Sequence, residues 1–111
     1  MGRHNLGELE QLVLLALMRL GEDGYGARIR QELLDRCGRS VTPGAIYPTL
    51  ERLEGRGLVT SAWGEPSSVR GGRARRHFKI TAAGLREVRR AWAQTAALAE
   101  GLMAALSPKA K

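Results

Sequence analysis

The stretch TPGAIYPTLERLEGRG, residues 42–57, decides the fold of this chain. Thr42 followed by Pro43 is the usual pairing of an N-cap residue with a first-turn proline. Gly57 is a typical residue at the end of a helix. The apolar residues between these signals recur at helical spacing and predict one buried face; they are Ile46, Leu50 and Leu53. The stretch therefore predicts a helix.

Pro48 falls inside this predicted helix. A proline there removes the hydrogen bond to the residue four positions back, which is Gly44, and crowds its carbonyl. Two alternatives follow: the helix is kinked at Tyr47, or residues 42–47 form a looser turn.

Two more helices are predicted before this stretch, at residues 6–20 and 25–37. Asn5 is the expected cap of the first helix, and Gly38 is the expected end of the second. The first helix is apolar on almost every face, and such a helix is normally buried all round. One small domain cannot cover all of its faces, so the sequence points to a second subunit.

After residue 57 the pattern changes to strands. Residues 58–63 predict a short strand, and the alternation of apolar and basic residues over 73–80 predicts a second strand. Thr81 caps a last helix with an apolar stripe that continues to Leu106. This order of helices and strands predicts a mainly α (α+β) winged helix-turn-helix fold with a two-stranded wing and a long C-terminal helix. We expect a DNA-binding domain at 5–81, a dimerisation helix at 82–106 and a disordered tail at 107–111.

Charge and composition narrow the function. The chain has 111 residues, with 18 Lys and Arg against 11 Asp and Glu, a net charge of +7. This excess favours a polyanionic partner, nucleic acid or an acidic membrane surface, although solubility alone is the alternative explanation. The longest apolar run, residues 12–18, is too short to cross a bilayer. We expect a cytoplasmic protein with no membrane partner. The single cysteine, Cys37, is expected to be a small buried residue rather than a redox switch.

The third helix and the wing are the candidate DNA contacts. Residues 42–50 carry no charge and offer hydroxyls, small residues and a helix N-terminus to the major groove. Between residues 58 and 80 the only acid is Glu65, so the wing suits a phosphate backbone. The alternatives are that Tyr47 only packs and that the wing is a solvated charge cluster. The expected DNA contacts are Thr42, Gly44, Ala45, Tyr47, Pro48, Thr49, Gly71, Gly72, Arg73, Arg75 and Arg76.

The first and last helices are the candidate dimer interface, because together they carry more apolar surface than one domain can bury. Pairing would place two reading helices about 34 Å apart, matching successive major grooves. The alternative is that the last helix folds back on its own domain. The expected dimerisation residues are Leu9, Leu12, Leu15, Leu85, Val88, Trp92, Ala96, Ala99, Leu102 and Leu106.

Several motifs together resemble the PadR family of transcriptional regulators. They are Leu6-Gly7-Glu8-Leu9-Glu10, Tyr25-Gly26, Gly44-Ala45-Ile46-Tyr47-Pro48-Thr49-Leu50, Arg52-Leu53-Glu54, Gly57-Leu58-Val59, Gly71-Gly72-Arg73 and Thr81-Ala82-Ala83-Gly84. The chain departs from many members at His77-Phe78, where they carry two tyrosines.

The resemblance implies a cytoplasmic homodimeric repressor on an inverted-repeat operator, with the last helix against the partner's first helix. It adds Tyr25 to the DNA contacts. Membership of the smaller subgroup implies release by a planar or hydrophobic effector, for which Trp92 is the candidate contact. Packing is the more common role for a tryptophan at such a position, and Trp63 is expected to be a packing residue.

Other classes of function fit less well. A winged-helix module that binds only proteins would not need so basic a wing. The chain lacks a glycine-rich phosphate loop, a paired-carboxylate signature and a metal-ligand cluster, so we expect no enzyme, cofactor or metal. RNA binding would need aromatic side chains on which bases can stack, and the sequence lacks such platforms.

Overall fold

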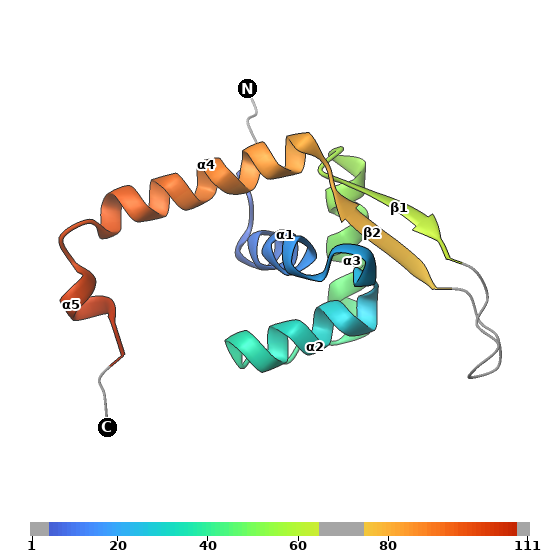
Figure 1. Ribbon diagram of the computed structural model, residues 1–111, viewed down its shortest axis with the longest axis horizontal. Helices are drawn as coiled ribbons and strands as arrows, with labels where there is room; N and C mark the ends of the chain where they lie inside the picture. The colour runs from blue at the N-terminus through green and yellow to red at the C-terminus, as the bar shows by residue number, and fades with distance from the viewer. Residues whose placement is uncertain (1–4, 65–74, 109–111) are drawn as a thin grey trace.

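The computed structural model describes residues 5–64 and 75–108. Within these ranges the chain forms helices, a 3₁₀ turn and two strands (Figure 1). In chain order they are α1 (Glu8–Leu20), η1 (Gly21–Asp23), α2 (Gly26–Cys37), α3 (Pro43–Gly55), β1 (Val59–Trp63), β2 (Arg76–Ile80), α4 (Ala82–Ala99) and α5 (Met103–Leu106). This order confirms the predicted winged helix-turn-helix plan.

The core lies between the first three helices and is closed by the sheet and the start of α4. Its residues are mostly Leu, Ile and Val, as the low aromatic content requires. The predicted inner face of α3 is confirmed, because Ile46, Leu50 and Leu53 are fully buried, and Ile29 of α2 is fully buried as well. Phe78 of β2 is the largest buried side chain.

The wing is an antiparallel pair of strands whose register runs from Val59 opposite Ile80 to Trp63 opposite Arg76. The link between η1 and α2 adds a short third edge, since Tyr25 forms a β-bridge with His77. The Phe78 N–H donates to the Gly24 carbonyl at 2.8 Å. β2 is therefore bonded to β1 on one edge and to the link before α2 on the other, and this second edge fixes the base of the wing to the body.

The helix ends follow the sequence signals, with one exception. Thr42 caps α3, its Oγ1 accepting from the Ala45 N–H at 3.2 Å. Gly38 ends α2 with φ +65°. At α1 the expected cap Asn5 is wrong: the N-cap is Gly7, whose N–H donates to Glu10 Oε1 at 2.8 Å.

Pro48 lies inside an unbroken α3, so the looser turn expected as one alternative does not form. Gly44, whose carbonyl would have received the missing hydrogen bond, is exposed, so water can satisfy that group.

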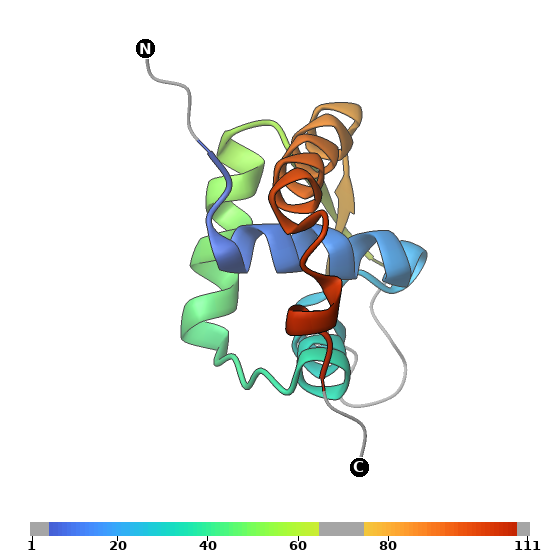
Figure 2. The ribbon, with the colours of Figure 1, turned by 90° about the vertical axis from the view of Figure 1, so that its left-hand side faces the viewer.

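The expected continuous last helix is wrong. α4 ends at Ala99, and α5 begins only at Met103. Gly101 has φ +84°, a conformation that glycine adopts readily and that ends a helix. The second half of α4 extends beyond the three-helix body, and α5 lies at its far end (Figures 1 and 2).

Two expectations of burial are also wrong. Cys37 is exposed at the end of α2. Trp63 is 70% exposed, because β1 runs past the edge of the core before it ends.

Candidate nucleic-acid interface

The first half of α3 presents a small, uncharged surface. Its exposed residues are Thr42, Pro43, Gly44, Ala45, Tyr47 and Pro48. The side chains on the other side of this segment enter the core, so the exposed face has a fixed orientation. The positive end of the α3 dipole lies at this exposed surface and favours a negative charge nearby.

Thr49 does not belong to this exposed surface, so the expected DNA contact is wrong. Thr49 is 1% exposed. Its hydroxyl donates to the Ala45 carbonyl at 2.8 Å and accepts from Arg52 Nη2 at 3.2 Å. Both hydrogen-bonding directions of the hydroxyl are therefore used within α3.

One side of Tyr47 packs against α2 and the other side is exposed, so the residue does more than fill space in the body. It is 42% exposed. Its other side lies against the first residue of α2, where a Cβ added to Gly26 would be 2.2 Å from Tyr47 Oη. The tyrosine thus fills the space above Gly26 and keeps an exposed face beside the helix N-terminus.

Arg75 lies at the base of the wing next to Tyr25. Its Cζ is 4.3 Å from the Tyr25 ring centroid, a cation–π geometry. The Tyr25 ring meets His77 edge-on at 5.3 Å. Arg75 is exposed. The expected contacts Gly71, Gly72 and Arg73 lie outside the described residues.

Arg76 is adjacent in sequence but points to the other face of the strand, toward α3. Its guanidinium donates to Glu51 Oε2 at 2.7 Å and to Glu54 Oε1 at 2.6 Å. Its Nε donates to Ser61 Oγ at 3.1 Å. The hydrogen bond to Glu51, reinforced by the charges of both glutamates, raises the pKa of Arg76 above its ordinary value despite partial desolvation.

The expectation that Arg76 contacts DNA is therefore wrong for this arrangement. Its charge is neutralised by two carboxylates, and it connects the wing to α3. Arg76 sets the position of the wing relative to α3.

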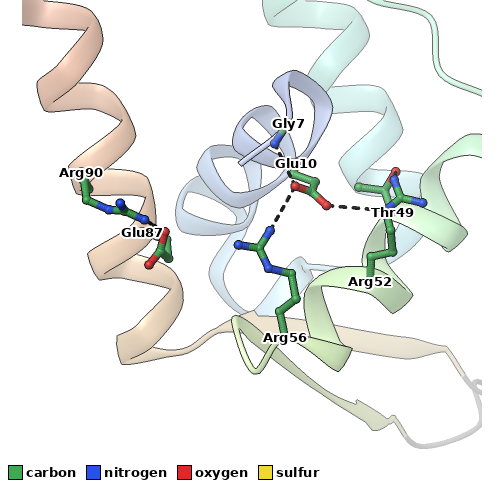
Figure 3. Close-up of polar contacts among 7 residues, drawn as sticks. All are labelled: Gly7, Glu10, Thr49, Arg52, Arg56, Glu87 and Arg90. Atoms are coloured by element: carbon green, nitrogen blue, oxygen red, sulfur yellow. Dashed lines mark hydrogen bonds and ion pairs between the residues drawn. The ribbon is translucent and has the colours of Figure 1, made fainter. Parts of the chain in front are cut away.

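Glu10 connects the other side of α3 to α1 (Figure 3). Besides accepting from the Gly7 N–H, its carboxylate lies 3.5 Å from Arg52 Nε and 3.3 Å from Arg56 Nη1. The Glu10 side chain is only 12% exposed. On α4, Glu87 and Arg90 form a separate ion pair in the same view. Sequence reasoning missed Glu10, although a first-turn glutamate three residues after the cap is a known capping signal.

The expected dimerisation residues fall into two groups. Val88 is 3% exposed in its own core, so its place in an intersubunit contact is wrong. Leu9, Leu12 and Leu85 are half-buried against the same core. The exposed or half-exposed remainder is Leu15, Trp92, Ala96, Ala99, Leu102 and Leu106.

Further exposed apolar residues flank this second group. They are Met18 on α1, Leu98 on α4 and Met103 on α5. Leu15, Met18 and Arg19 also line a surface depression. Across residues 5–64 and 75–108, every helix is too short or too polar to serve as a membrane span.

Known proteins are similar to this chain in sequence and in fold. Residues 14–90 match the family described as the transcriptional regulator PadR-like family. A transcriptional regulator of Mycobacterium tuberculosis is 49% identical over 70 residues, which make up 60% of this chain and 61% of that protein. The chain thus matches less than two thirds of that relative's length.

Two solved structures show the same architecture. A PadR-like transcription factor from Bacteroides fragilis superposes with a TM-score of 0.72, 29% identity and 85% of each chain covered. Bacillus subtilis PadR in complex with operator DNA gives a TM-score of 0.63 at 24% identity, covering 73% of this chain and 45% of that one, and therefore shows the fold alone.

The family match covers well over half of the chain and contains α2, α3 and both described strands of the wing. Its members are transcriptional regulators, which supports the expectation of a regulator rather than an enzyme. This chain belongs to the PadR-like family of transcriptional regulators.

Proposed function

We propose that the chain is a cytoplasmic, sequence-specific regulator of transcription that binds double-stranded DNA as a homodimer and represses from an inverted-repeat operator. The observation that carries this proposal is the exposed, uncharged first half of α3, with its capped N-terminus, beside a basic wing. A helix of this kind enters the major groove with its N-terminal residues, while a wing follows the adjacent backbone. The operator complex of Bacillus subtilis PadR, which has this fold, supports the assignment.

In this proposal the residues divide into reading and positioning groups. The exposed residues of the reading segment, above all Tyr47, face the base edges, and thymine methyls suit its small apolar residues. Arg75 contacts a phosphate, as do the basic wing residues outside the described ranges. Thr49, Arg76 and Glu10 hold α3 and the wing in place without touching DNA.

The dimer forms through the apolar surface of α4, α5 and the second half of α1. An inverted repeat follows, because a two-fold dimer presents the same reading segment to two half-sites. Trp92, 62% exposed on this surface, is the proposed contact for a planar or hydrophobic effector.

The test begins with selection of bound duplexes from a random pool, followed by titration of the selected operator at several salt concentrations. Arg75→Ala is expected to weaken binding to every duplex and to lower the log–log salt slope by about one unit, because one phosphate contact is lost.

Arg36→Ala is the matched control, since it also removes one positive charge. Arg36 lies in the last turn of α2, whereas Arg75 lies beside Tyr25 at the start of that helix. Its salt slope is expected to stay at the wild-type value. Failure to select any duplex sequence would refute specific DNA binding, and equal slopes for the two variants would remove Arg75 from the interface.

A further inference from the structure

Trp63 occupies an unusual position for so large an apolar side chain. Side chains alternate along β1, so Trp63 shares its face with Val59 and Ser61. Val59 is 1% exposed, so this is the face that covers the core. Trp63 lies on the same face but beyond the core, and it is 70% exposed.

The same face of the wing points toward α3. Trp63 is the cross-strand neighbour of Arg76, and such neighbours lie side by side on one face. Arg76 reaches Glu51 and Glu54 of α3, and Ser61 donates to Glu54 Oε2 at 2.8 Å. Trp63 is therefore placed beside the ion pairs that join the wing to α3, on the α3 side of the wing and at the end of β1 that extends beyond the core.

The chemistry of a duplex matches an exposed indole at this place. Paired bases are stacked on one another and expose only their edges in the grooves, so a side chain that lies along the backbone meets the deoxyribose rings as its apolar surface. Phosphate oxygens next to each sugar accept hydrogen bonds, and the indole N–H is a donor with no acceptor function. Three arginines follow Trp63 in the sequence before β2 and favour the same polyanion; they are Arg70, Arg73 and Arg75.

We propose that Trp63 is a direct DNA contact, packing its ring on a backbone deoxyribose and donating its N–H to a neighbouring phosphate. This inference rests on the proposed function, since it requires the duplex to lie against α3 and the wing. It predicts an apolar contribution to affinity that is independent of the salt-sensitive arginine contacts.

The first experiment observes the indole directly. The chain contains two tryptophans, so protein labelled with 5-fluorotryptophan gives two ¹⁹F resonances, and Trp63→Phe assigns them by deleting one. Addition of the selected duplex to the wild-type protein is expected to shift the Trp63 resonance and to reduce its solvent isotope shift. If labelled duplex is bound by fluorescence anisotropy while the Trp63 resonance keeps its position and isotope shift, the inference is overturned and the proposed function stands.

The same experiment separates other occupants of this face. A Trp63 resonance that is already protected from solvent in the free protein would mean that another segment or a second copy covers the indole, and would also overturn the inference. Absence of duplex binding would overturn both proposals together.

The second experiment measures energetics. Trp63→Ala is expected to weaken operator binding about tenfold at every salt concentration, because an interface tryptophan is a typical anchor. The salt slope should be unchanged, because no charge is lost.

Thr60→Ala is the matched control, since Thr60 is exposed on the opposite face of the same strand. It should bind like the wild type. Wild-type affinity for Trp63→Ala, or an equal loss for Thr60→Ala, would contradict the contact. Thermal unfolding of both variants should match the wild type, since both side chains are exposed.

Discussion

Gly84 lies in the first turn of α4, where the helix passes over the start of the wing. A Cβ at this position would lie 2.2 Å from the Leu58 carbonyl oxygen and 2.7 Å from Ile80 Cγ1. The Leu58 carbonyl is backbone that also accepts from the Thr81 N–H at 3.0 Å, so it cannot move aside freely. Gly84 thus sets how closely α4 approaches the wing.

Gly84→Ala is therefore expected to lower the free energy of unfolding by about 1–3 kcal/mol, the usual range for overpacking. Urea denaturation measures the change. Gly55→Ala is the matched control, because Gly55 is helical and a Cβ there meets no atom within 4 Å. That substitution should raise stability by about 0.4–1 kcal/mol. Similar denaturation midpoints for the two variants would show that α4 adjusts without strain.

Arg75 and Arg76 show what the sequence could and could not predict at single residues. Their type and place predicted a basic wing, and alternation placed them on opposite faces. The sequence did not reveal that Glu51 and Glu54, more than twenty residues away, neutralise Arg76. A pairing between distant residues has no local signature, so a charge's partner is the part of a site that a single sequence hides.

At the scale of elements, α3 is held from two sides by ion pairs at its second half. Arg76 of β2 binds Glu51 and Glu54, while Glu10 of α1 binds Arg52 and Arg56. The first half carries no such restraint by charge and relies on its cap and on Tyr47. The second half of α3 is therefore the part that ion pairs hold in place, and the first half, which we propose to contact DNA, is left exposed.

Glu10→Gln tests the restraint from α1. The Glu10 side chain is 12% exposed, so losing its charge removes the ion pairs that it makes with Arg52 and Arg56 and weakens the cap at Gly7. We expect the free energy of unfolding to fall by about 1–2 kcal/mol. Urea denaturation at constant ionic strength measures it.

Glu8→Gln is the control, since Glu8 lies in the same first turn but is 80% exposed and pairs only with Arg39 in the described part of the chain. Its loss should change stability by less than about 0.5 kcal/mol. Comparable losses for both variants would mean that the helix dipole, which acts on both carboxylates, explains the effect instead of the contacts to α3.

Element types were predictable where signals are local. Capping by Thr42 and Thr81, the burial of α2 and α3, and the two strands follow from spacing and from cap residues. The break after Ala99 was missed because the apolar spacing continues to Leu106 across Gly101. A periodic pattern shows which residues share a face, but it does not reveal a change in backbone direction at one glycine with positive φ.

At the scale of the whole molecule, most exposed large apolar side chains lie away from the wing. Leu15 and Met18 are on α1, and Trp92, Leu98 and Leu102 follow along the far half of α4 and the turn after it. The start of α4 packs on its own core through Gly84 and Val88. The sequence left open whether the last helix folds back, and the structure shows that its first half packs and its second half remains exposed.

An exposed helix half of this kind is expected to pair with a second copy, and Ala96→Glu tests that pairing. Ala96 lies one turn after Trp92 on the stripe proposed for dimerisation and is exposed in the single chain. A carboxylate buried there without a partner is costly, so sedimentation velocity should show a monomer at micromolar concentration. Affinity for an inverted repeat should fall by about a hundredfold or more, because two linked half-site contacts become separate events.

Ala93→Glu separates this expectation from any general effect of a new acid on α4. It makes the same change three residues earlier on the same helix, and Ala93 is also exposed. Its helical neighbours are Arg86, Arg89 and Arg90, at spacings of seven, four and three residues, so a glutamate there gains favourable charges. This variant should remain a dimer and keep wild-type operator affinity. If both variants dissociate, or if Ala96→Glu remains a dimer, the stripe through Trp92 and Ala96 is not the contact that joins two copies.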